Sequence, residues 1–353
     1  YLYLWHFKFC KFIGNIMKKL ILVTVGPSSL NEKVIKKISD LDVHLFRINL
    51  SHTRIEDVEN VIHTIQKWSD IPICLDSEGA QIRNQEMVSE SVEFKKDKQV
   101  KIHHENIIGD SENISFAPSY VSKQFKVGDL IKVDFNAVGL KVIKDCGNYL
   151  LANVESPGHV GSNKAADIDS DIVLNPITEK DEKAFKIGLN NGIVNYSLSF
   201  TNTAEDVKKI RNIIGLKANL ISKIESVQGV LNLGEILPLV DQILIDRGDL
   251  SREIPIEKIP FIQRRIISFA KSKQVPVYVA TNLLETMIKS NSPTRAEVND
   301  IASTLLMGAD GLVLAAETAI GKHPIDVVMM TKSLIDQYYK WSPESSFLDI
   351  IDN

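Results

Sequence analysis

Two short stretches of the sequence combine acidic residues with a lysine or a glycine. In "SKIES", Lys223 and Glu225 lie two residues apart, so their side chains point to the same side of a strand. In "IDRGDLS", Asp249 follows Gly248, whose missing side chain permits close backbone approach. Two carboxylates supply the hard oxygen ligands that Mg²⁺ prefers, and a buried lysine beside them can neutralise an anion in transit. Together these groups predict phosphoryl transfer, which depends mainly on positioning and charge stabilisation.

Polar residues at the ends of other predicted strands can complete such a site. Arg47 offers a planar guanidinium fork for a phosphate. Asn49, Ser51 and Asp76 supply oxygens for a monovalent-cation cage. Any one of these residues alone is more typical of a solvated charge or a turn, but at least five predicted strands end in such groups. Neither a Walker-type phosphate loop nor a GxGxxG stretch occurs, which argues against a P-loop or Rossmann nucleotide site.

The composition argues against several other classes of protein. The 353 residues carry a net charge of −4, so we expect no nucleic-acid partner. Three cysteines without metal-ligand spacing fit a reducing compartment better than a disulfide framework, so we expect a cytoplasmic protein. No apolar run approaches the roughly 20 residues that span a bilayer, so we expect no membrane partner. These observations also make a cell-adhesion role for Arg247-Gly248-Asp249 a poor hypothesis.

The elements that would position these residues alternate between strands and helices. Strand-like runs are predicted at residues 20–26, 43–50, 72–76, 193–200, 218–225, 242–246, 276–281 and 311–317. Helical spacing of apolar residues occurs between and after them, for example at 31–41, 54–69, 178–192 and 203–215. Eight strands that each lead into a helix or an excursion predict an α/β fold, the (β/α)8 TIM barrel of about 250 residues. A doubly wound sheet has the same rhythm and stays an alternative.

One segment interrupts this rhythm after the third strand. Residues 85–165 alternate in polarity, carry turn signals and lack helical periodicity, so we expect an inserted all-β lid domain. The barrel would then consist of residues 17–84 and 166–342. Residues 1–16 are rich in aromatic side chains and precede Met17. We interpret them as an extension or as sequence upstream of the true start, with a short membrane-directed segment as the alternative.

Seven stretches of the sequence follow one another in the order and spacing known from one enzyme family. They read "VTVGPSS", "FRINLSHT", "LDSEGAQIRN", "SKIESVQGV", "DRGDL", "ATNLLETMIKSNSPTRAEVNDIA" and "GADGLVLAAETAIGKHP". The block from residue 276 to residue 324 is the most specific, because it contains "PTRAE" and "AET". On these motifs the chain resembles the pyruvate kinase family from residue 19 to residue 340.

The resemblance implies a (β/α)8 barrel with a β domain inserted after the third strand. It also implies phosphoryl transfer from phosphoenolpyruvate to ADP, giving pyruvate and ATP, with Mg²⁺ and usually K⁺ as cofactors. Lys223 would then be catalytic, stabilising the transferring phosphoryl group and the enolate. The other residues carried over are Arg47, Gly248, Asp249 and Thr281 for the substrate, Glu225 and Asp249 for Mg²⁺, Asn49, Ser51, Asp76 and Ser77 for K⁺, and Arg83 and Lys164 for the nucleotide. The same resemblance implies that copies of this chain could associate into a homo-oligomer through the surfaces of their barrels.

The sequence departs from the family's pattern at several of these motifs. Asp246 stands where the family usually has Ala, beside a site for an anionic substrate, and we expect it to turn away from the substrate or to contact a cation. Other departures are Glu78, Ala80, Gln81, Phe135, Ala315 and Ala316. They leave two alternatives open: an enzyme for a different enol phosphate or acceptor, and a non-catalytic binding protein. The chain ends soon after the eighth helix, so we also expect the family's C-terminal regulatory domain to be absent.

Overall fold

The computed structural model describes residues 18–352, except residues 80, 135–136 and 171. These residues form two compact units, which are described separately below. The first unit combines the chain up to Ser77 with the chain from Glu179 onward, and the second runs from Glu78 to Thr178. The predicted extension 1–16 and the departures Ala80 and Phe135 lie outside the described residues.

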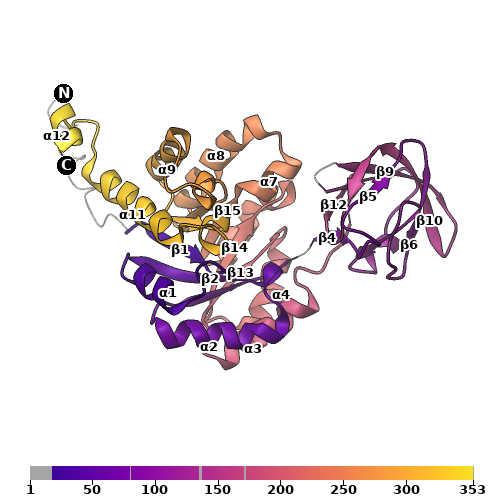
Figure 1. Ribbon diagram of the computed structural model, residues 1–353, viewed down its shortest axis with the longest axis horizontal. Helices are drawn as coiled ribbons and strands as arrows, with labels where there is room; N and C mark the ends of the chain where they lie inside the picture. Colours follow the sequence, from indigo (N-terminus) through magenta and orange to yellow (C-terminus); the bar gives the residue numbers. More distant parts are fainter. Residues whose placement is uncertain (1–17, 80, 135–136, 171, 353) are drawn as a thin grey trace. The chain divides into compact units, whose positions relative to one another are not determined.

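The first unit is a closed barrel of eight parallel strands, which confirms the predicted (β/α)8 fold (Figure 1). The strands are β1 Leu20–Thr24, β2 Val43–Asn49, β3 Ile73–Asp76, β13 Asn195–Leu198, β14 Asn219–Ile224, β15 Gln242–Asp246, β16 Val277–Ala280 and β17 Gly311–Leu314. They follow one another around the barrel in sequence order. The doubly wound alternative is wrong, because β17 pairs in parallel with β1 and closes the sheet.

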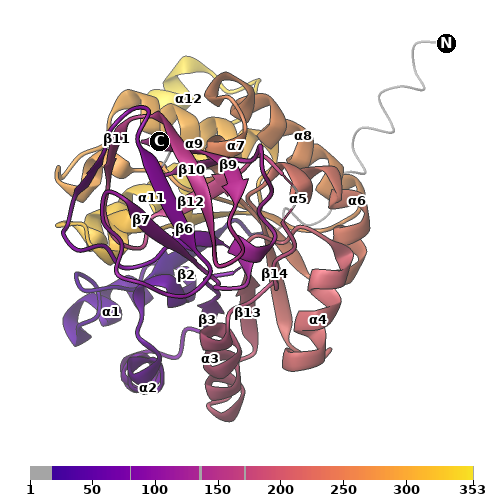
Figure 2. The same ribbon diagram turned by 90° about the vertical axis from the view of Figure 1, so that its right-hand side faces the viewer.

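Helices cover the outside of this barrel (Figure 2). They are α1 Glu32–Ser39, α2 Val58–Trp68, α3 Glu179–Asn190, α4 Ala204–Ile214, α5 Val227–Leu231, α6 Leu233–Ile236, α7 Arg247–Glu253, α8 Ile259–Ser272, α9 Arg295–Met307, α10 Ala316–Ala319 and α11 Pro324–Lys340. A last helix, α12 Phe347–Asp352, follows α11 and lies away from the strands (Figure 1). Helices α1 and α4 begin one residue later than predicted because Asn31 and Thr203 are N-caps: their side chains accept from the Val34 and Asp206 N–H groups. Helix α2 begins later still, after a 3₁₀ turn at Ile55–Asp57.

Apolar side chains fill the barrel interior beneath its polar end. They are Leu22, Leu45, Cys74, Ile221, Leu244, Tyr278, Ala280 and Val313. Four charged residues each follow one of these apolar residues by two positions along the same strand. They are Arg47 after Leu45, Asp76 after Cys74, Lys223 after Ile221 and Asp246 after Leu244. Since side chains two residues apart on a strand share a face, these four groups also point into the barrel, one layer nearer its carboxyl end. The two-residue pleat therefore gathers the charged residues above an apolar plug.

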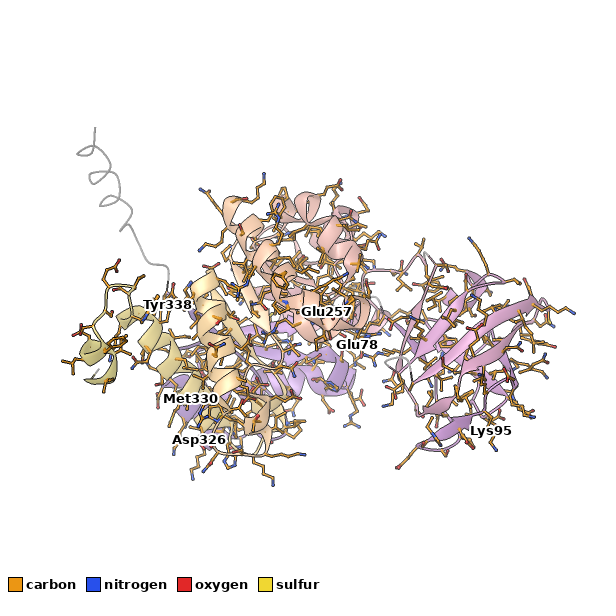
Figure 3. The ribbon with its side chains drawn as sticks, turned by 90° about the horizontal axis from the view of Figure 1, so that it is seen from above. Glu78, Lys95, Glu257, Asp326, Met330 and Tyr338 are labelled. Carbon is orange, nitrogen blue, oxygen red and sulfur yellow. The ribbon has the colours of Figure 1, made fainter. Side chains whose placement is uncertain are left out.

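Helix α11 fastens the first strand to the rest of the barrel. The Lys19 ammonium lies 2.7 Å from the Ala309 carbonyl oxygen and 5.3 Å from the centre of the Tyr338 ring. Figure 3 labels Tyr338 near the end of α11, with Asp326 and Met330 earlier on the same helix. The Lys19 N–H group also donates to the Tyr339 hydroxyl, so α11 adds to the strand pairing that holds the start of β1.

The second unit consists of β-strands with their own apolar core. Seven strands close a small barrel: β4 Ile82–Asn84, β6 Gln99–His103, β7 Asn113–Ala117, β8 Leu130–Val133, β9 Val138–Asp145, β10 Tyr149–Ser156 and β12 Ala165–Ile168. A separate pair is formed by β5 Val92–Phe94 and β11 Gly158–Val160. Side chains that alternate along the strands, such as Val100, Ile102, Leu150, Ala152 and Val154, are buried in this core.

The boundaries of this β unit lie farther out than the predicted 85–165. Strand β4 was assigned to the barrel from its sequence, but it pairs with β7 and β12. Strand β12 begins at the predicted boundary and pairs with β8 as well as β4. These two strands close the sheet, so the unit extends over residues 78–178. The sequence signal was weak because β4 is only three residues long.

Among the helices of the described residues, none has both the length and the apolar character needed to cross a membrane.

We predict that Thr203→Ala destabilises the first unit by about 1 kcal/mol. Thr203 and Asp206 form a reciprocal capping box at the start of α4, so the substitution leaves the Asp206 N–H group without its partner. Urea denaturation would measure the free energy of unfolding. Thr203→Ser is the matched control and should retain most of the stability, and equal stability of all three proteins would contradict the prediction.

Candidate active site

The charged residues at the carboxyl ends of the strands meet around the Lys223 ammonium. Its nitrogen lies 2.7 Å from Glu225 Oε1, 3.5 Å from Asp76 Oδ2 and 3.8 Å from Asp246 Oδ2. It also donates a 3.0 Å hydrogen bond to Ser199 Oγ. Only 5% of the Lys223 surface is exposed. The lysine is thus a buried cation surrounded by acceptors.

The environment keeps Lys223 charged. Burial alone would lower the pKa of its ammonium, but the carboxylates of Asp76, Glu225 and Asp246 outweigh burial and raise this pKa above its ordinary value. A lysine in this state does not exchange protons near neutral pH. It acts as a fixed positive charge for an anion that enters the site.

Asp76 joins Lys223 to Arg47. The Arg47 Nε donates a 2.8 Å hydrogen bond to Asp76 Oδ2, and its Nη2 also donates to that oxygen. The Arg47 Nη1 donates to Thr24 Oγ1 at 2.8 Å. These bonds use three of the five guanidinium N–H donors and fix the plane of the group. Burial opposes ionisation of Asp76, but Arg47 and Lys223 hold the pKa of its carboxyl below the ordinary value.

Three carboxylates form an acidic group beside Lys223, which we call the carboxylate cluster. It consists of Glu225, Asp246 and Asp249, each of which offers an oxygen within 4.8 Å of the others. Burial raises the pKa of Glu225 to about 8, with Asp246 and Asp249 adding to the rise against the pull of Lys223. Burial and Asp246 also raise the pKa of Asp249. Because crowded carboxylates are costly without a counter-charge, this donor set fits a hard divalent cation such as Mg²⁺.

The start of α7 gives this part of the site its shape. Asp246 is the N-cap of α7, and its Oδ1 accepts a 3.2 Å hydrogen bond from the Gly248 N–H group. The same oxygen accepts a hydrogen bond from the Thr281 hydroxyl. A Cβ on Gly248 would lie 2.8 Å from Thr281 Cγ2, so only glycine fits here without a shift. Asp246 therefore does not turn away from the site; it contacts a cation, the other predicted outcome, because its Oδ2 lies 3.8 Å from the Lys223 ammonium.

Arg247 holds the strand end that carries Thr281. Its guanidinium donates to the carbonyl oxygens of Ala280 and Thr281, and its Nη1 lies 2.7 Å and 2.9 Å from the two carboxylate oxygens of Asp300 on α9. Thr281 has a φ of 75°, which is strained for a residue that is not glycine. The Arg247-Gly248-Asp249 tripeptide is thus built into the barrel end by the arginine, which argues against an adhesion loop.

The residues predicted to hold a monovalent cation lie around the Asp76 end of the site. Asn49 Oδ1 accepts from the Ser51 N–H group at 3.0 Å, which caps a short 3₁₀ turn. Ser77 Oγ accepts from the Ser199 N–H group at 2.9 Å. Asp76 Oδ1 is buried, and among the described residues it has no hydrogen-bond partner. A buried oxygen in this state supports a cation at this position, while the Asn49 and Ser77 oxygens already have donors.

The two residues predicted to contact a nucleotide lie in the second unit. Arg83 is on β4, opposite Ala165, and its Nη1 donates a 3.0 Å hydrogen bond to the Asn163 carbonyl. The Lys164 ammonium lies 3.5 Å from Asp134 Oδ2. The antiparallel pairing of β4 with β12 sets Arg83 opposite Ala165, so the chain positions of Arg83 and Lys164 are neighbours across the two strands.

Three contributors to the barrel site were missing from the sequence interpretation. Ser199 follows the fourth barrel strand and donates its hydroxyl to the Ser77 carbonyl at 2.7 Å while it accepts from Lys223. Arg252 lies on α7 and its Nη1 is 3.3 Å from Asp249 Oδ1. Thr24 bonds Arg47 from the first strand. The pleat could have identified Thr24, which stands two residues after the interior Leu22, and Ser199, which stands two residues after Ser197 in register with Asp76, but Arg252 on a helix follows no such rule.

The end of the eighth strand differs from the prediction. The strand-like run 311–317 stops as β17 at Leu314, and the short helix α10 begins at Ala316. This turn lets Glu317 fold back, so that its Oε2 accepts from the Ala315 N–H group at 3.1 Å. Burial raises the pKa of Glu317 above its ordinary value. Glu317 therefore supports the backbone of this turn.

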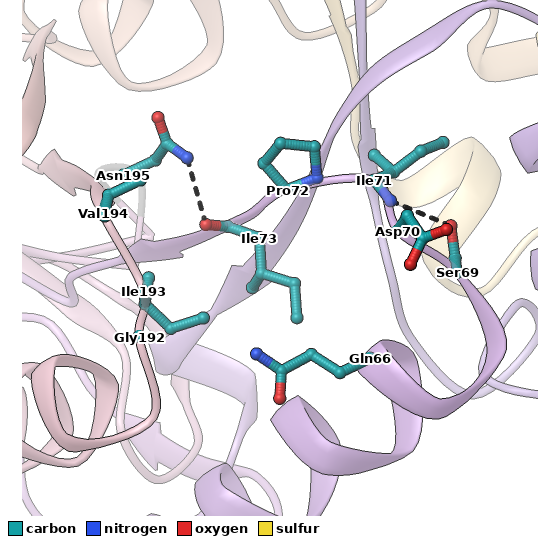
Figure 4. A pocket seen from close by; sticks show the side chains of 10 residues that line it. All are labelled: Gln66, Ser69, Asp70, Ile71, Pro72, Ile73, Gly192, Ile193, Val194 and Asn195. Carbon is teal, nitrogen blue, oxygen red and sulfur yellow. Dashed lines mark hydrogen bonds between the residues drawn. The ribbon is translucent and has the colours of Figure 1, made fainter.

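One hollow lies at the opposite end of the barrel from these residues (Figure 4). It has a volume of about 250 Å³ and is lined by Gln66, by residues 69–73 and by residues 192–195, which precede or begin β3 and β13. Two hydrogen bonds join its residues: the Asn195 side-chain amide donates to the Ile73 carbonyl, and the Ile71 N–H group donates to Ser69 Oγ. The catalytic groups of (β/α)8 enzymes gather at the carboxyl ends of the strands, so this hollow is separate from the candidate site.

Comparison with known proteins decides the family. The sequence profile described as "Pyruvate kinase, barrel domain" matches residues 16–328. The chain belongs to the pyruvate kinase family. It is 35% identical over 329 residues to a pyruvate kinase of Thermotoga maritima, covering 91% of this chain and 71% of that protein. It is 33% identical over 326 residues to a pyruvate kinase of Clostridium acetobutylicum, covering 89% and 68%.

Family membership indicates which ions the charged groups of this site are suited to bind. Pyruvate kinases are phosphotransferases and generally use Mg²⁺ and K⁺. The carboxylate cluster fits the divalent ion by its donor chemistry, and Lys223 supplies the fixed positive charge beside it.

We predict that Asp76→Asn destabilises the barrel by about 3–5 kcal/mol, because it leaves Arg47 and Lys223 as buried cations with one counter-charge fewer. Chemical denaturation of the two proteins would measure the loss. Asp241→Asn is the matched control, since Asp241 pairs with Arg211 at a more exposed place. A loss no larger than that of the control would show that Asp76 is not the counter-ion of the site.

We predict that the affinity for Mg²⁺ falls with decreasing pH. The pKa of Glu225 is raised to about 8, so the metal-free protein holds a proton there that a cation must displace. Each pH unit below this value should weaken Mg²⁺ binding by up to about ten-fold. Without metal, the stability of the fold changes in the opposite direction, because ionising Glu225 removes stability as the pH rises from the ordinary glutamate pKa of 4.5 toward 8.

Calorimetric titration of Mg²⁺ at pH 6.5 and pH 8.5 would measure this dependence. Glu225→Gln carries no titrating proton, so its weaker binding should be nearly independent of pH. An affinity of the unmodified protein that is equal at both pH values would contradict the assignment of Glu225 as a ligand.

Proposed function

We propose that the barrel site transfers the phosphoryl group of phosphoenolpyruvate to ADP and produces pyruvate and ATP. The observation that carries this proposal is the Lys223 ammonium, 2.7 Å from Glu225 and directly beside the carboxylate cluster. A buried cation that stays charged next to a divalent-metal donor set is what a charged, transferring phosphoryl group requires. Membership of the pyruvate kinase family supports the same reaction.

Glu225 and Asp249 would hold Mg²⁺, which supplies charge stabilisation for the phosphoryl group when bound. Lys223 would stabilise the negative charge on the phosphoryl oxygens and then on the enolate oxygen. Arg47 would hold a phosphate oxygen with the guanidinium N–H groups that its bonds to Asp76 and Thr24 leave over. Gly248, Asp249 and Thr281 would contact the substrate on its carboxylate side.

In the proposed reaction an oxygen of the terminal ADP phosphate attacks phosphorus, and the bond from phosphorus to the enol oxygen breaks. The electron pair of that bond stays on the enol oxygen, and the enolate takes a proton at carbon to give pyruvate. Lys223 is an unsuitable donor for this proton, because its carboxylate partners raise the pKa of its ammonium. Water that reaches the exposed side of the site is the simplest source.

Further assignments belong to the same proposal. A monovalent cation, K⁺ in this family, would sit near Asp76 and be held by oxygens of Asn49, Ser51, Asp76 and Ser77. Arg83 and Lys164 would contact the nucleotide phosphates. Both lie in the inserted β unit, residues 78–178, which we propose acts as a lid. A cytoplasmic location fits the free thiols of Cys74 and Cys146.

The test is an assay of pyruvate formation with phosphoenolpyruvate, ADP, Mg²⁺ and K⁺. We predict that Lys223→Met lowers kcat by about 10²–10³-fold or more, since it removes the fixed cation of the site. Lys217→Met is the matched control, because Lys217 is exposed just before β14. No turnover by the unmodified protein above Lys223→Met would refute the proposal.

The same assay distinguishes the alternative reactions. Turnover of phosphoenolpyruvate with another acceptor in place of ADP would identify a different phosphotransferase of the same fold. Mg²⁺ and phosphoenolpyruvate that together fail to raise the melting temperature would identify a protein without a working site. The retained Lys223, Glu225 and Asp249 arrangement favours the enzyme over this last alternative.

A further inference from the structure

The two oxygens of Asp246 have different partners in the site. Its Oδ1 accepts hydrogen bonds from the Gly248 N–H group, at 3.2 Å, and from the Thr281 hydroxyl. Its Oδ2 faces the Lys223 ammonium at 3.8 Å and takes part in the carboxylate cluster. One end of this carboxylate therefore binds neutral donors, while the other faces the cation and the metal ligands.

The neutral donors are held in place whether or not Asp246 binds them. The Gly248 N–H group lies in the first turn of α7, where a backbone donor has no partner within its own helix. Thr281 is fixed by Arg247, which donates to its carbonyl oxygen and is itself anchored on Asp300. Close packing of Gly248 against the Thr281 methyl group fixes their separation. This pair is ready to bind a carboxylate without rearrangement.

The substrate of the proposed function brings a carboxylate to the same place. In phosphoenolpyruvate the carboxylate and the phosphoester oxygen are bonded to the same carbon atom. A substrate whose ester oxygen meets Lys223 therefore has its carboxylate at the adjoining ends of β14, β15 and β16. Of the described residues there, Gly248 and Thr281 offer neutral donors to it, and Asp246 already binds both.

We propose that Asp246 is a specificity-determining residue whose carboxylate occupies the place of the substrate carboxylate and must move aside before the substrate binds. This inference rests on the proposed function, since it concerns the same pocket. Asp246 thereby weakens the binding of any ligand that carries a carboxylate next to its reacting group, whereas a ligand without one has no need of the donor pair.

The charge of the site strengthens the competition. Four carboxylates, those of Asp76, Glu225, Asp246 and Asp249, face three cations, those of Arg47, Lys223 and Arg252. Bound Mg²⁺ would offset the carboxylates that hold it, but Asp246 still places a negative charge at the donor pair, next to an incoming carboxylate. Removing Asp246 would take away this local repulsion and would free both donors, so the two effects act in the same direction.

The experiment is calorimetric titration of oxalate, in the presence of Mg²⁺, into the unmodified protein and two variants. Asp246→Ala should bind oxalate at least about ten-fold more tightly, because it frees two donors for a charged acceptor. Asp246→Asn should bind with intermediate affinity, because its amide oxygen can still accept from Gly248 and Thr281 but carries no charge. Inorganic phosphate has no carboxylate that needs the donor pair, so it should respond only to the lost charge, and its affinities for Asp246→Ala and Asp246→Asn should agree within about two-fold.

Two controls separate the inference from simpler effects. Glu285→Ala removes an exposed carboxylate at the same end of the barrel and should leave oxalate binding unchanged. Mg²⁺ alone is titrated into each protein, and the melting temperature of each variant confirms that it is folded. Oxalate binding by Asp246→Ala that equals or falls below that of the unmodified protein would overturn the proposal. Weaker Mg²⁺ binding together with that result would identify Asp246 as a metal ligand instead.

Turnover distinguishes failure of this inference from failure of the proposed function. If Asp246→Ala binds oxalate more tightly and lowers the KM for phosphoenolpyruvate by a similar factor, both stand. If it binds oxalate more tightly while neither protein forms pyruvate, the donor competition stands and the proposed reaction fails. If pyruvate forms but oxalate affinity and KM do not change, Asp246 has no part in carboxylate selection.

Discussion

The barrel end depends on one constraint, which is that the buried Lys223 ammonium must be neutralised by carboxylates that the fold brings to it. Asp76, Glu225 and Asp246 come from three different parallel strands or their ends, and they reach the same nitrogen only when β3, β13, β14 and β15 have paired side by side. Arg47 then balances Asp76 from β2. Removing one partner leaves an uncompensated buried charge, so the electrostatics of the site and the pairing of these strands stabilise each other.

This constraint explains why the site tolerates an extra carboxylate. Asp246 finds donors of its own at Gly248 and Thr281, so its charge does not depend on Lys223 alone. Arg252 adds a cation beside Asp249. The acidic side of the site therefore stays compatible with the fold, while the charge of Asp246 and its occupied donors affect the binding of ligands. The fold therefore remains stable with Asp246 in place, whereas the affinity for a substrate that carries a carboxylate is lowered.

The sequence predicted the eight strands and most strand-end residues because both follow from local rules. Strand runs are apolar and short, and the two-residue pleat assigns Arg47, Asp76, Lys223 and Asp246 to one face. The partners of Asp246 were not predictable, since Thr281 reaches it across 35 residues and only after Arg247 has fixed the next strand end. The edges of the β insert were missed because three-residue β4 is defined by pairing with distant strands.

The central claim is that Lys223 and the carboxylate cluster form one centre for a divalent cation and an enol phosphate. A crystal of the protein soaked with Mn²⁺ and oxalate tests it most directly, through the anomalous scattering of manganese. The account predicts one strong peak at about 2.0–2.2 Å from carboxylate oxygens of both Glu225 and Asp249, with oxalate between the ion and Lys223. A peak elsewhere, or no peak at a saturating Mn²⁺ concentration, would contradict it.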